Sequence, residues 1–421
     1  MTTGLAGLDL PAGWQWWPLK HAALAVNRGS APDYVDDGPV WAVSQAVNQP
    51  HRLDWDRARF HGGSRAAGLK GLLAPEDILI NSTGRGTLGR VGYFSKSPDD
   101  RPAMADGHVT RVRTDKRVLH PRFAFHYFSS EPFQHYIYSA LIVGATNQIE
   151  LVGERLDSAP VMIPPIEEQR RIADFLDAET RLIDATRSAR SRMIKLLELK
   201  RDRLVDEHVT GGQDVGGFVP LKYLVSSVSV GIVITPAAWY VESGGVPALR
   251  GLNVKPGKIT TSDLVQISHE GHSLHRKSRL AAGDLVVVRT GQAGAAAVVP
   301  PELDGINCID LVIVRPGSAF VPRFAEYLLN SSYAKRRVSE FSVGSIQAHF
   351  NVAAMKAMPV PRYSIAEQKR RVDAIEEATR RIEWAVARMR EQDRLLAERR
   401  QALITAAVTG QIDVTTGRGV D

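Results

Sequence analysis

The sequence predicts an α+β protein that contains two tandem globular domains, each followed by a long charged helix. Three observations predict it. The chain has 421 residues, which is too long for one ordinary core. It contains an internal repeat, and each copy of the repeat ends in a segment with helical periodicity.

The repeat is clearest in the two charged segments. Residues 166–209 and 365–408 align without a gap at a shift of 199, so that Gln169 falls on Gln368. Upstream the match is weaker but continues, since a Pro-Arg-Phe triplet of the first half recurs at the corresponding place in the second. The chain is therefore a tandem duplication.

Both charged segments are predicted to be helices. They consist of helix-forming residues, and apolar residues recur every three or four positions. About 40 residues give a rod of roughly 60 Å. The apolar stripe is narrow, which favours pairing of the two helices over packing of each helix on its own domain. The residues expected to pair the helices are Ile172, Leu176, Ile183, Met193, Leu197, Leu204, Ile375, Ile382, Val386, Met389, Leu396 and Leu403.

Each globular half is predicted to be a sheet domain followed by a helix. Short apolar runs between Gly, Pro and Asp turns are typical of strands in such domains. The strands expected in the first half are 40–44, 78–82, 90–93 and 109–112. Those expected in the second half are 246–249, 285–289, 296–299 and 311–314. The helices are expected at 121–129 and from Pro322 to about Glu340.

The stretch ILINSTGRGTLG at 78–89 raises the alternative of a dinucleotide site, because an apolar run precedes G-x-G-x-x-G. The second half keeps the Thr-Gly pair but has Ala293 in place of the middle glycine, Gly86. A strand pattern follows the glycines, and no helix start supplies a phosphate-binding terminus. We therefore expect a hairpin turn in both halves, which argues against an oxidoreductase that binds NAD or flavin.

Composition narrows the classes of function. A net charge of +7 weakly favours a polyanionic partner such as nucleic acid. The single cysteine, Cys308, cannot form an intramolecular disulfide, which is typical of a cytosolic protein. No apolar run is long enough to predict a membrane span, and no signal peptide is expected.

Catalytic motifs are missing from the sequence. It has no P-loop, no G-x-S-x-G elbow, no H-E-x-x-H and no Asn/Asp-Pro-Pro-aromatic motif of the kind that amino-methyltransferases carry. The spacing of His269, His272 and His275 could suit a metal, but no Cys or carboxylate cluster completes a site. We therefore expect no catalytic residue and no metal site, and we assign any chemistry to a partner.

The repeated motifs closely resemble the specificity subunit of type I restriction–modification systems. The resemblance lies in PVMIPPIEEQRRIADFLD and its second copy PVPRYSIAEQKRRVDAIEE, in the Val-Thr-Gly that ends each charged segment, and in the Thr-Gly turns. It covers essentially the whole chain. It implies two target-recognition domains joined by two long helices in an antiparallel coiled coil. The implied boundaries are 1–164 for the first recognition domain, 165–210 for the first helix, 211–363 for the second recognition domain, 364–410 for the second helix and 411–421 for a tail.

The resemblance also implies a function. Each recognition domain reads one half of a bipartite, asymmetric target in double-stranded DNA, while the helices set the spacer and dock two methyltransferase subunits. Restriction endonuclease/translocase subunits complete the complex, in the cytoplasm of a bacterium or archaeon. This chain is then non-catalytic and binds no cofactor, because the partner subunits bind S-adenosylmethionine, ATP and Mg²⁺. The alternative is a stand-alone or orphan bipartite DNA-binding protein without restriction partners.

Candidate DNA contacts lie in the Thr-Gly turns and in the polar tails near the end of each globular half. Gln and Asn can pair with adenine and Arg with guanine. The same residues could instead be plain turn residues or phosphate contacts, which position a protein without specifying sequence. The candidates are Thr83, Arg85, Arg90, Asn147, Gln148, Arg289, Thr290, Gln292, Gln347 and His349.

Overall fold

The computed structural model describes residues 5, 8–50, 52–63, 69–84, 86–144, 149–211, 217–291, 293–342, 351–415 and 418–419. The chain divides into two compact units. Unit 1 consists of Met1–Ala189 and Gln392–Asp421, and unit 2 consists of Arg190–Glu391. Within the described residues, no helix is both long and apolar enough to cross a membrane.

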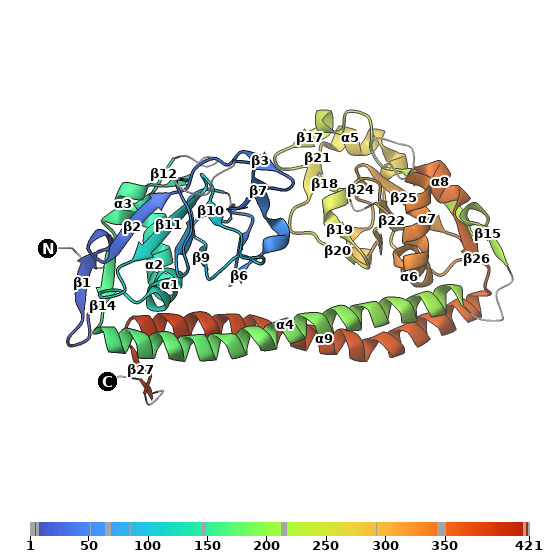
Figure 1. Cartoon of the computed structure of the whole chain (residues 1–421). Helices are drawn as coiled ribbons and strands as arrows, with labels where there is room; N and C mark the ends of the chain where they lie inside the picture. The colour runs from blue at the N-terminus through green and yellow to red at the C-terminus, as the bar shows by residue number, and fades with distance from the viewer. Residues whose placement is uncertain are drawn as a thin grey trace. The chain divides into compact units, whose positions relative to one another are not determined.

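Unit 1 contains two four-stranded sheets (Figure 1). The first is antiparallel, in the order β2-β11-β8-β9, and consists of β2 (Ala23–Arg28), β8 (Ile78–Asn81), β9 (Val91–Tyr93) and β11 (Val109–Thr114). The second has the order β10-β4-β7-β3, in which β10 runs parallel to β4. It consists of β3 (Tyr34–Val35), β4 (Val40–Val43), β7 (Arg59–His61) and β10 (Ala103–Ala105).

Smaller elements complete unit 1. Its helices are α1 (Pro121–Ser129), α2 (Glu131–Tyr136), which continues into a π-helical turn at Ile137–Leu141, and α3 (Gly153–Asp157). Its short strand pairs are β1 (Gln15–Pro18) with β14 (Pro160–Ile163), β5 (Asn48–Gln49) with β6 (Arg52–Leu53), β12 (Ile142–Val143) with β13 (Glu150–Leu151), and β27 (Ile412–Asp413) with β28 (Arg418–Gly419).

Unit 2 repeats this architecture strand for strand. Its antiparallel sheet has the order β16-β25-β22-β23 and consists of β16 (Val225–Val230), β22 (Leu285–Val288), β23 (Ala296–Val298) and β25 (Leu311–Pro316). Its mixed sheet has the order β17-β21-β18-β24, with β18 parallel to β24. It consists of β17 (Tyr240–Val241), β18 (Val246–Leu249), β21 (Val265–Ile267) and β24 (Asn307–Cys308).

The remaining elements of unit 2 are short. Its helices are α5 (His269–Leu274), α6 (Pro322–Asn330), α7 (Ser332–Ser342) and α8 (Val352–Ala357). Its short strand pairs are β15 (Phe218–Pro220) with β26 (Pro359–Pro361) and β19 (Val254–Lys255) with β20 (Lys258–Ile259).

The apolar strands β8 and β22 are buried on both faces. In unit 1, Ile78 and Ile80 pack in the core with α1, whereas Leu79 between them packs in the core of the mixed sheet. In unit 2, Leu285 and Val287 face the helical core, and the alternate residues face the second core. Side chains alternate across a strand, so burial on both faces requires the continuous apolar runs that the sequence contains.

The single helix expected at 322–340 is wrong, because it is two helices broken at Ser331. This serine has an extended backbone, donates a hydrogen bond from Oγ to the carbonyl of Leu328, and accepts one from the amide of Ala334. Its hydroxyl therefore satisfies backbone groups at the end of α6 and the start of α7. Ser130 lies at the same break between α1 and α2 and bonds the carbonyl of Tyr127.

The two expected long helices are α4 (Ile166–Thr210) and α9 (Ile365–Val408). In unit 1 the first half of α4 lies beside the last part of α9, and Arg400 of α9 donates to Asp184 of α4 at 3.0 Å (Figure 1). In unit 2 the last part of α4 lies beside the first half of α9, and Arg371 donates to the carbonyl of His208 at 2.6 Å. Low residue numbers of one helix face high numbers of the other, which confirms the expected antiparallel coiled coil.

The long helices also pack on the globular part of each unit. Ile172 and Leu176 of α4 join Ile404 and Val408 of α9 in the main core of unit 1. In unit 2 the corresponding core contains Ile375 of α9 and residues near the end of α4. From the sequence, pairing of the two helices and packing of each helix on its own domain were treated as alternatives. In the structure, the same apolar stripe does both.

Candidate nucleic-acid interface

The glycine-containing stretch of unit 1 is a hairpin turn, as expected. Strands β8 and β9 pair antiparallel with Ile78 opposite Tyr93, and the chain reverses between them. Gly84 and Gly89 have φ values of +100° and +79°, which L side chains rarely adopt. The amide of Gly89 donates to the carbonyl of Asn81 at 2.8 Å and closes the turn. A strand follows the glycines where a dinucleotide site needs a helix.

The turn of unit 2 is built in the same way but is two residues shorter. Gly291 and Gly294 have positive φ values of +74° and +90°, and the amide of Gly294 donates to the carbonyl of Val288 at 2.9 Å. Gly294 is therefore the counterpart of Gly89. The alignment that set Ala293 against the middle glycine is wrong, because the second turn lacks two residues rather than one glycine.

Thr83 opens the turn of unit 1 within a polar cluster. Its Oγ1 is 2.8 Å from Nδ1 of His108, which is exposed. Gln45 lies on the other side, where its Oε1 accepts from Thr87 Oγ1 at 3.3 Å. The turn thus presents hydroxyl, imidazole and amide groups held in fixed positions, as base-edge readers must be.

The side chain of Arg90 is engaged within the protein. Its Nη1 donates to the carbonyl of Asn48 at 3.0 Å and to Oε1 of Gln49 at 3.4 Å. Asn48 is fully buried, and its Nδ2 donates to Asn81 Oδ1 at 2.9 Å and to the carbonyl of Arg90 at 3.1 Å. Arg90 therefore fastens the β5–β6 hairpin to the end of the turn.

Arg289 begins the turn of unit 2 and pairs with an acid. Its Nη1 is 2.6 Å from Asp310 Oδ1, and its side chain is 18% exposed. Its Nε is buried and has no hydrogen-bond partner among the described residues. Asp310 has a φ of +51°, a left-handed conformation that Asp tolerates better than most residues. Thr290, the next residue, is exposed.

Asp310 and His108 occupy equivalent places that the sequence interpretation did not single out. Each comes directly before the central strand of its antiparallel sheet, β25 or β11, and each bonds a residue at the start of its turn. Both residues directly precede strands that align between the two halves of the sequence, and this position could have identified them as candidates. The two turns therefore share a scaffold and differ in the groups that they present.

Six candidate DNA contacts lie outside the described residues: Arg85, Asn147, Gln148, Gln292, Gln347 and His349. The four that are described, Thr83, Arg90, Arg289 and Thr290, all lie at the two turns. Arg90 is held by the hairpin beside its turn, whereas Thr290 is open to solvent.

The residues expected to pair the helices differ in burial. Met193 is 46% exposed, whereas its neighbour Ile194 is half-buried and continues the apolar stripe. The buried members are Ile172, Leu176, Ile183, Ile375, Ile382 and Val386. The half-buried members are Leu197, Leu204, Met389, Leu396 and Leu403.

The repeated glutamine of the charged segments anchors the start of each long helix. In unit 1, Gln169 is fully buried, accepts from the amide of His120 at 2.7 Å, and donates to the carbonyls of Val118 and Pro164. In unit 2, Gln368 makes the three equivalent bonds at the start of α9. The same glutamine recurs in both copies of the sequence repeat, and in both units it bonds equivalent backbone groups.

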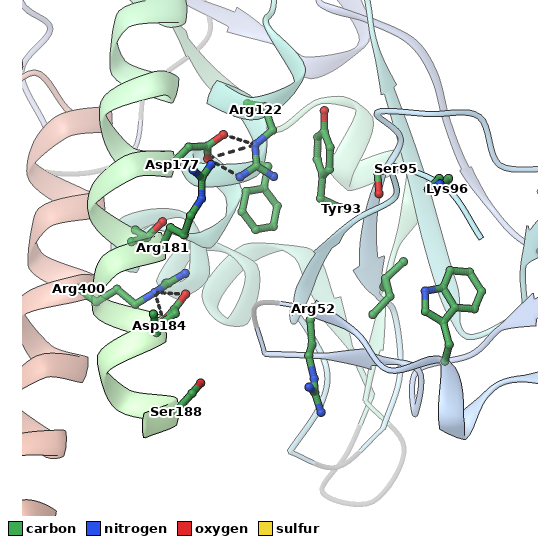
Figure 2. A pocket seen from close by; sticks show the side chains of 15 residues that line it. Arg52, Tyr93, Ser95, Lys96, Arg122, Asp177, Arg181, Asp184, Ser188 and Arg400 are labelled. Atoms are coloured by element: carbon green, nitrogen blue, oxygen red, sulfur yellow. Dashed lines mark hydrogen bonds and ion pairs between the residues drawn. The ribbon is translucent and has the colours of Figure 1, made fainter. Parts of the chain in front are cut away.

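A partly buried ionic cluster joins α1 to α4 in unit 1. Asp177 accepts from Arg122 Nε at 2.8 Å and lies 2.7 Å from Nε2 of His126 (Figure 2 shows the Arg122 bonds). Burial would raise the pKa of Asp177, but the hydrogen bonds from His126 and Arg122 outweigh it and lower this pKa to about 2. Burial lowers the pKa of His126, so its neutral ring donates from Nε2 to the carboxylate.

A cavity of about 770 Å³ opens beside this cluster in unit 1. Figure 2 shows Arg122 and Asp177 at one end, beside Tyr93, and the Arg400–Asp184 pair along its helical wall. The other wall includes Arg52 of β6. The lining residues come from β6, β9, α1, α4 and α9 and from the segments that follow β6 and β9, all within unit 1.

The histidines of the 269–275 segment do not converge. His272 Nδ1 lies 2.6 Å from Asn307 Oδ1, and His275 packs edge-on against Trp239. Among the described residues, no group of three or more His, Cys, Asp or Glu side chains is arranged to hold a metal ion.

Sequence comparisons match this chain to specificity proteins of type I restriction–modification systems. The family model for the type I restriction modification DNA specificity domain matches residues 70–195. The StySPI specificity subunit of Salmonella potsdam is 25% identical over 182 residues, which are 41% of this chain and 38% of the relative. The EcoBI specificity subunit of Escherichia coli is 20% identical over 333 residues, which are 72% of this chain and 66% of the relative. The chain thus spans less than two thirds of the length of these curated relatives.

A solved structure shares the fold over nearly the whole chain. It belongs to a study of complex assembly and conformational transition of the type I R-M system. The superposition has a TM-score of 0.72 at 17% identity and covers 96% of this chain and 100% of that chain.

Proposed function

We propose that this chain, which resembles the specificity subunits of type I restriction–modification systems, is the DNA-specificity subunit of such a complex. Each unit reads one half of a bipartite, asymmetric target in double-stranded DNA. The observation that carries the proposal is the repeated strand order of the two units, combined with turns that present different side chains. Two copies of one scaffold suit two half-sites, and unlike turns suit unlike sequences.

The turns supply the reading groups in this proposal. Arg289 is held by Asp310 through one nitrogen, which fixes the plane of a guanidinium that can bond guanine with two donors. Thr83 and His108 offer smaller donors and acceptors in unit 1. The two half-sites therefore differ in sequence. The Gln169 and Gln368 anchors fix each sheet domain to a long helix, so that the helices set the spacer between half-sites.

The chemistry belongs to partners. The chain is a non-catalytic subunit whose helices dock two methyltransferase subunits, and restriction endonuclease/translocase subunits complete the assembly. S-adenosylmethionine, ATP and Mg²⁺ are bound by those partners. Exposed apolar residues on the helices, such as Leu196 at 61% and Trp384 at 67%, support a helix-docking role.

The test is a map of methylated adenines in the host with and without this chain. Deletion is expected to abolish methylation of one bipartite motif, and unchanged methylation would reject the proposal. Exchanging residues 1–164 with those of a relative is expected to change one half-site only. Deleting about four residues from both helices, roughly one turn, is expected to change the spacer and leave the half-sites intact.

The alternative of an orphan DNA-binding protein is tested with the purified chain alone. Tight, sequence-specific binding of duplex DNA without methyltransferase would favour the alternative. Specific binding that requires added methyltransferase would favour the specificity subunit.

A further inference from the structure

The cavity of unit 1 carries a large excess of positive charge. Among its described lining residues, five side chains are cationic and two are anionic. The two anions are already neutralised: Asp177 by Arg122, and Asp184 by Arg400 at 3.0 Å (Figure 2). The other three cations pair with no acid that lines the cavity.

These three cations, Arg52, Lys96 and Arg181, are exposed. Arg181 of α4 is exposed and has no ion pair among the described residues. Arg52 is 74% exposed and lies 3.8 Å from Asp54, and Lys96 is 76% exposed and lies 4.0 Å from Asp100. Contacts this long between exposed groups hold a side chain weakly. The hydroxyls of Ser95 and Ser188 also line the cavity.

Unit 2 provides an internal comparison. A cavity of about 300 Å³ in unit 2 is lined by Asp202, Val205 and Lys335, which correspond to Gln401, Ile404 and Gln134 of unit 1. These unit 1 residues line a neighbouring cavity of about 200 Å³ and not the larger cationic one. The described lining of the unit 2 cavity contains three cations and three anions. One of the anions is Glu326, which stands where unit 1 has Phe125, is buried and pairs with Arg323. The described lining of the unit 2 cavity is therefore balanced in charge, whereas that of the larger unit 1 cavity is net positive.

We propose that the cavity of unit 1 is an anion site that binds a phosphate group through Arg52, Lys96 and Arg181. The phosphate belongs either to the backbone of a DNA duplex that crosses the opening or to a free nucleotide that enters it. A cavity of this size accepts a nucleotide-sized ligand, and Tyr93 and Trp55 add aromatic surface to its lining. The duplex form rests on the proposed function, and the nucleotide form does not.

The experiment uses the full chain and the triple variant Arg52→Gln/Lys96→Gln/Arg181→Gln. The matched control is Lys20→Gln/Arg171→Gln/Arg399→Gln, which removes the same charge from exposed cations of unit 1 that do not line the cavity. Calorimetry measures binding of pyrophosphate and of ATP without metal. The salt dependence of affinity for a duplex without the target is measured in parallel, and thermal unfolding verifies that both variants are folded.

If a free nucleotide is the ligand, the chain binds pyrophosphate or ATP, and the triple variant binds at least about tenfold more weakly while the control does not. If duplex DNA is the ligand, the slope of log affinity against log salt falls by about 0.9 for each lost phosphate contact, and the control retains more of the slope. The inference is overturned if triple variant and control agree in both measurements. Should the chain still direct methylation of its motif in that case, the proposed function stands without this site.

Discussion

Units 1 and 2 keep the same scaffold and differ in their charged side chains. Both contain an antiparallel sheet beside a mixed sheet in the same strand order, and both bury one glutamine at the start of a long helix. The Arg122–Asp177 pair of unit 1 recurs as Arg323–Glu376 in unit 2, but the surroundings of the pair differ. In unit 1 the side chains of the pair are 29% and 23% exposed and the buried His126 also contacts Asp177, whereas in unit 2 the side chains are 46% and 43% exposed. Packing and backbone hydrogen bonds maintain the shared scaffold, whereas the exposure of the ion pairs differs between the two units.

The largest effect is expected where the two units are most alike. Gln169→Ala and Gln368→Ala each leave one backbone amide and two carbonyls unpaired in a buried site. Each change is expected to lower the free energy of unfolding of its own unit by about 3 kcal/mol. Hydrogen exchange measures the loss unit by unit.

Gln392→Ala is the matched control, because this glutamine of α9 is exposed. It is expected to change stability by less than about 0.5 kcal/mol. A loss from Gln368→Ala no greater than that of the control would refute the equivalence of the two anchors.

The sequence was sufficient for features set by local pattern. Strands β8 and β22 were placed within one residue, because continuous apolar runs end at Gly-containing turns, and the long helices followed from their periodicity. The two- and three-residue strands β3 and β7 were missed, because such short segments become strands only through their partners. The break at Ser331 was missed because a serine hydroxyl overrides helix propensity there.

The candidate site was also predicted in part, because local sequence pattern marks the two turns. The Thr-Gly pairs marked both turns, and Thr83 and Arg289 lie in them. The Asp177 cluster was invisible, since its members are separated by more than 50 residues and only the fold brings them together. The partners His108 and Asp310 were missed because their role depends on a neighbouring strand end.

A second prediction sharpens the contrast between the ionic contacts. The pKa of Asp177 is about 2 in the folded protein and 3.8 ordinarily, so its stabilising effect is fully present above about pH 4 and is lost as the pH falls toward 2. Asp177→Asn is expected to cost about 2 kcal/mol of unfolding free energy at neutral pH and to remove this acid-dependent loss. Denaturant titrations at several pH values measure both effects.

Glu376→Gln is the corresponding change in unit 2. Its pair with Arg323 has side chains 43% and 46% exposed, so the expected cost is below about 1 kcal/mol. An unaltered loss of stability between pH 4 and 2 in Asp177→Asn would show that other carboxyls cause it.

A third prediction separates the turns and rests on the proposed function. Arg289→Ala is expected to weaken recognition of the half-site read by unit 2 about tenfold, because it removes a donor pair fixed by Asp310. Thr83→Val, which removes the bond to His108, is expected to affect the other half-site. Methylation of duplexes altered in one half-site at a time distinguishes the two.

Arg276→Ala is the control for charge, since Arg276 is exposed in the same unit. It is expected to change affinity for all duplexes alike. The assignment fails if Arg289→Ala weakens recognition of both half-sites equally.

The smallest effect is expected along the two long helices, where the ion pairs of the two units differ in solvent exposure. Arg187 and Asp393 of unit 1 lie 3.0 Å apart with side chains 28% and 33% exposed, whereas Arg390 of unit 2 is 64% exposed beside Glu198. Arg390→Gln is expected to cost no more than about 0.5 kcal/mol and Arg187→Gln about 1 kcal/mol. Both costs are measured by thermal unfolding at low salt and at about 1 M salt, where screening should abolish the first and leave part of the second. The reverse order would mean that exposure does not govern these pairs, and that the helices of unit 2 depend on charge where those of unit 1 depend on packing.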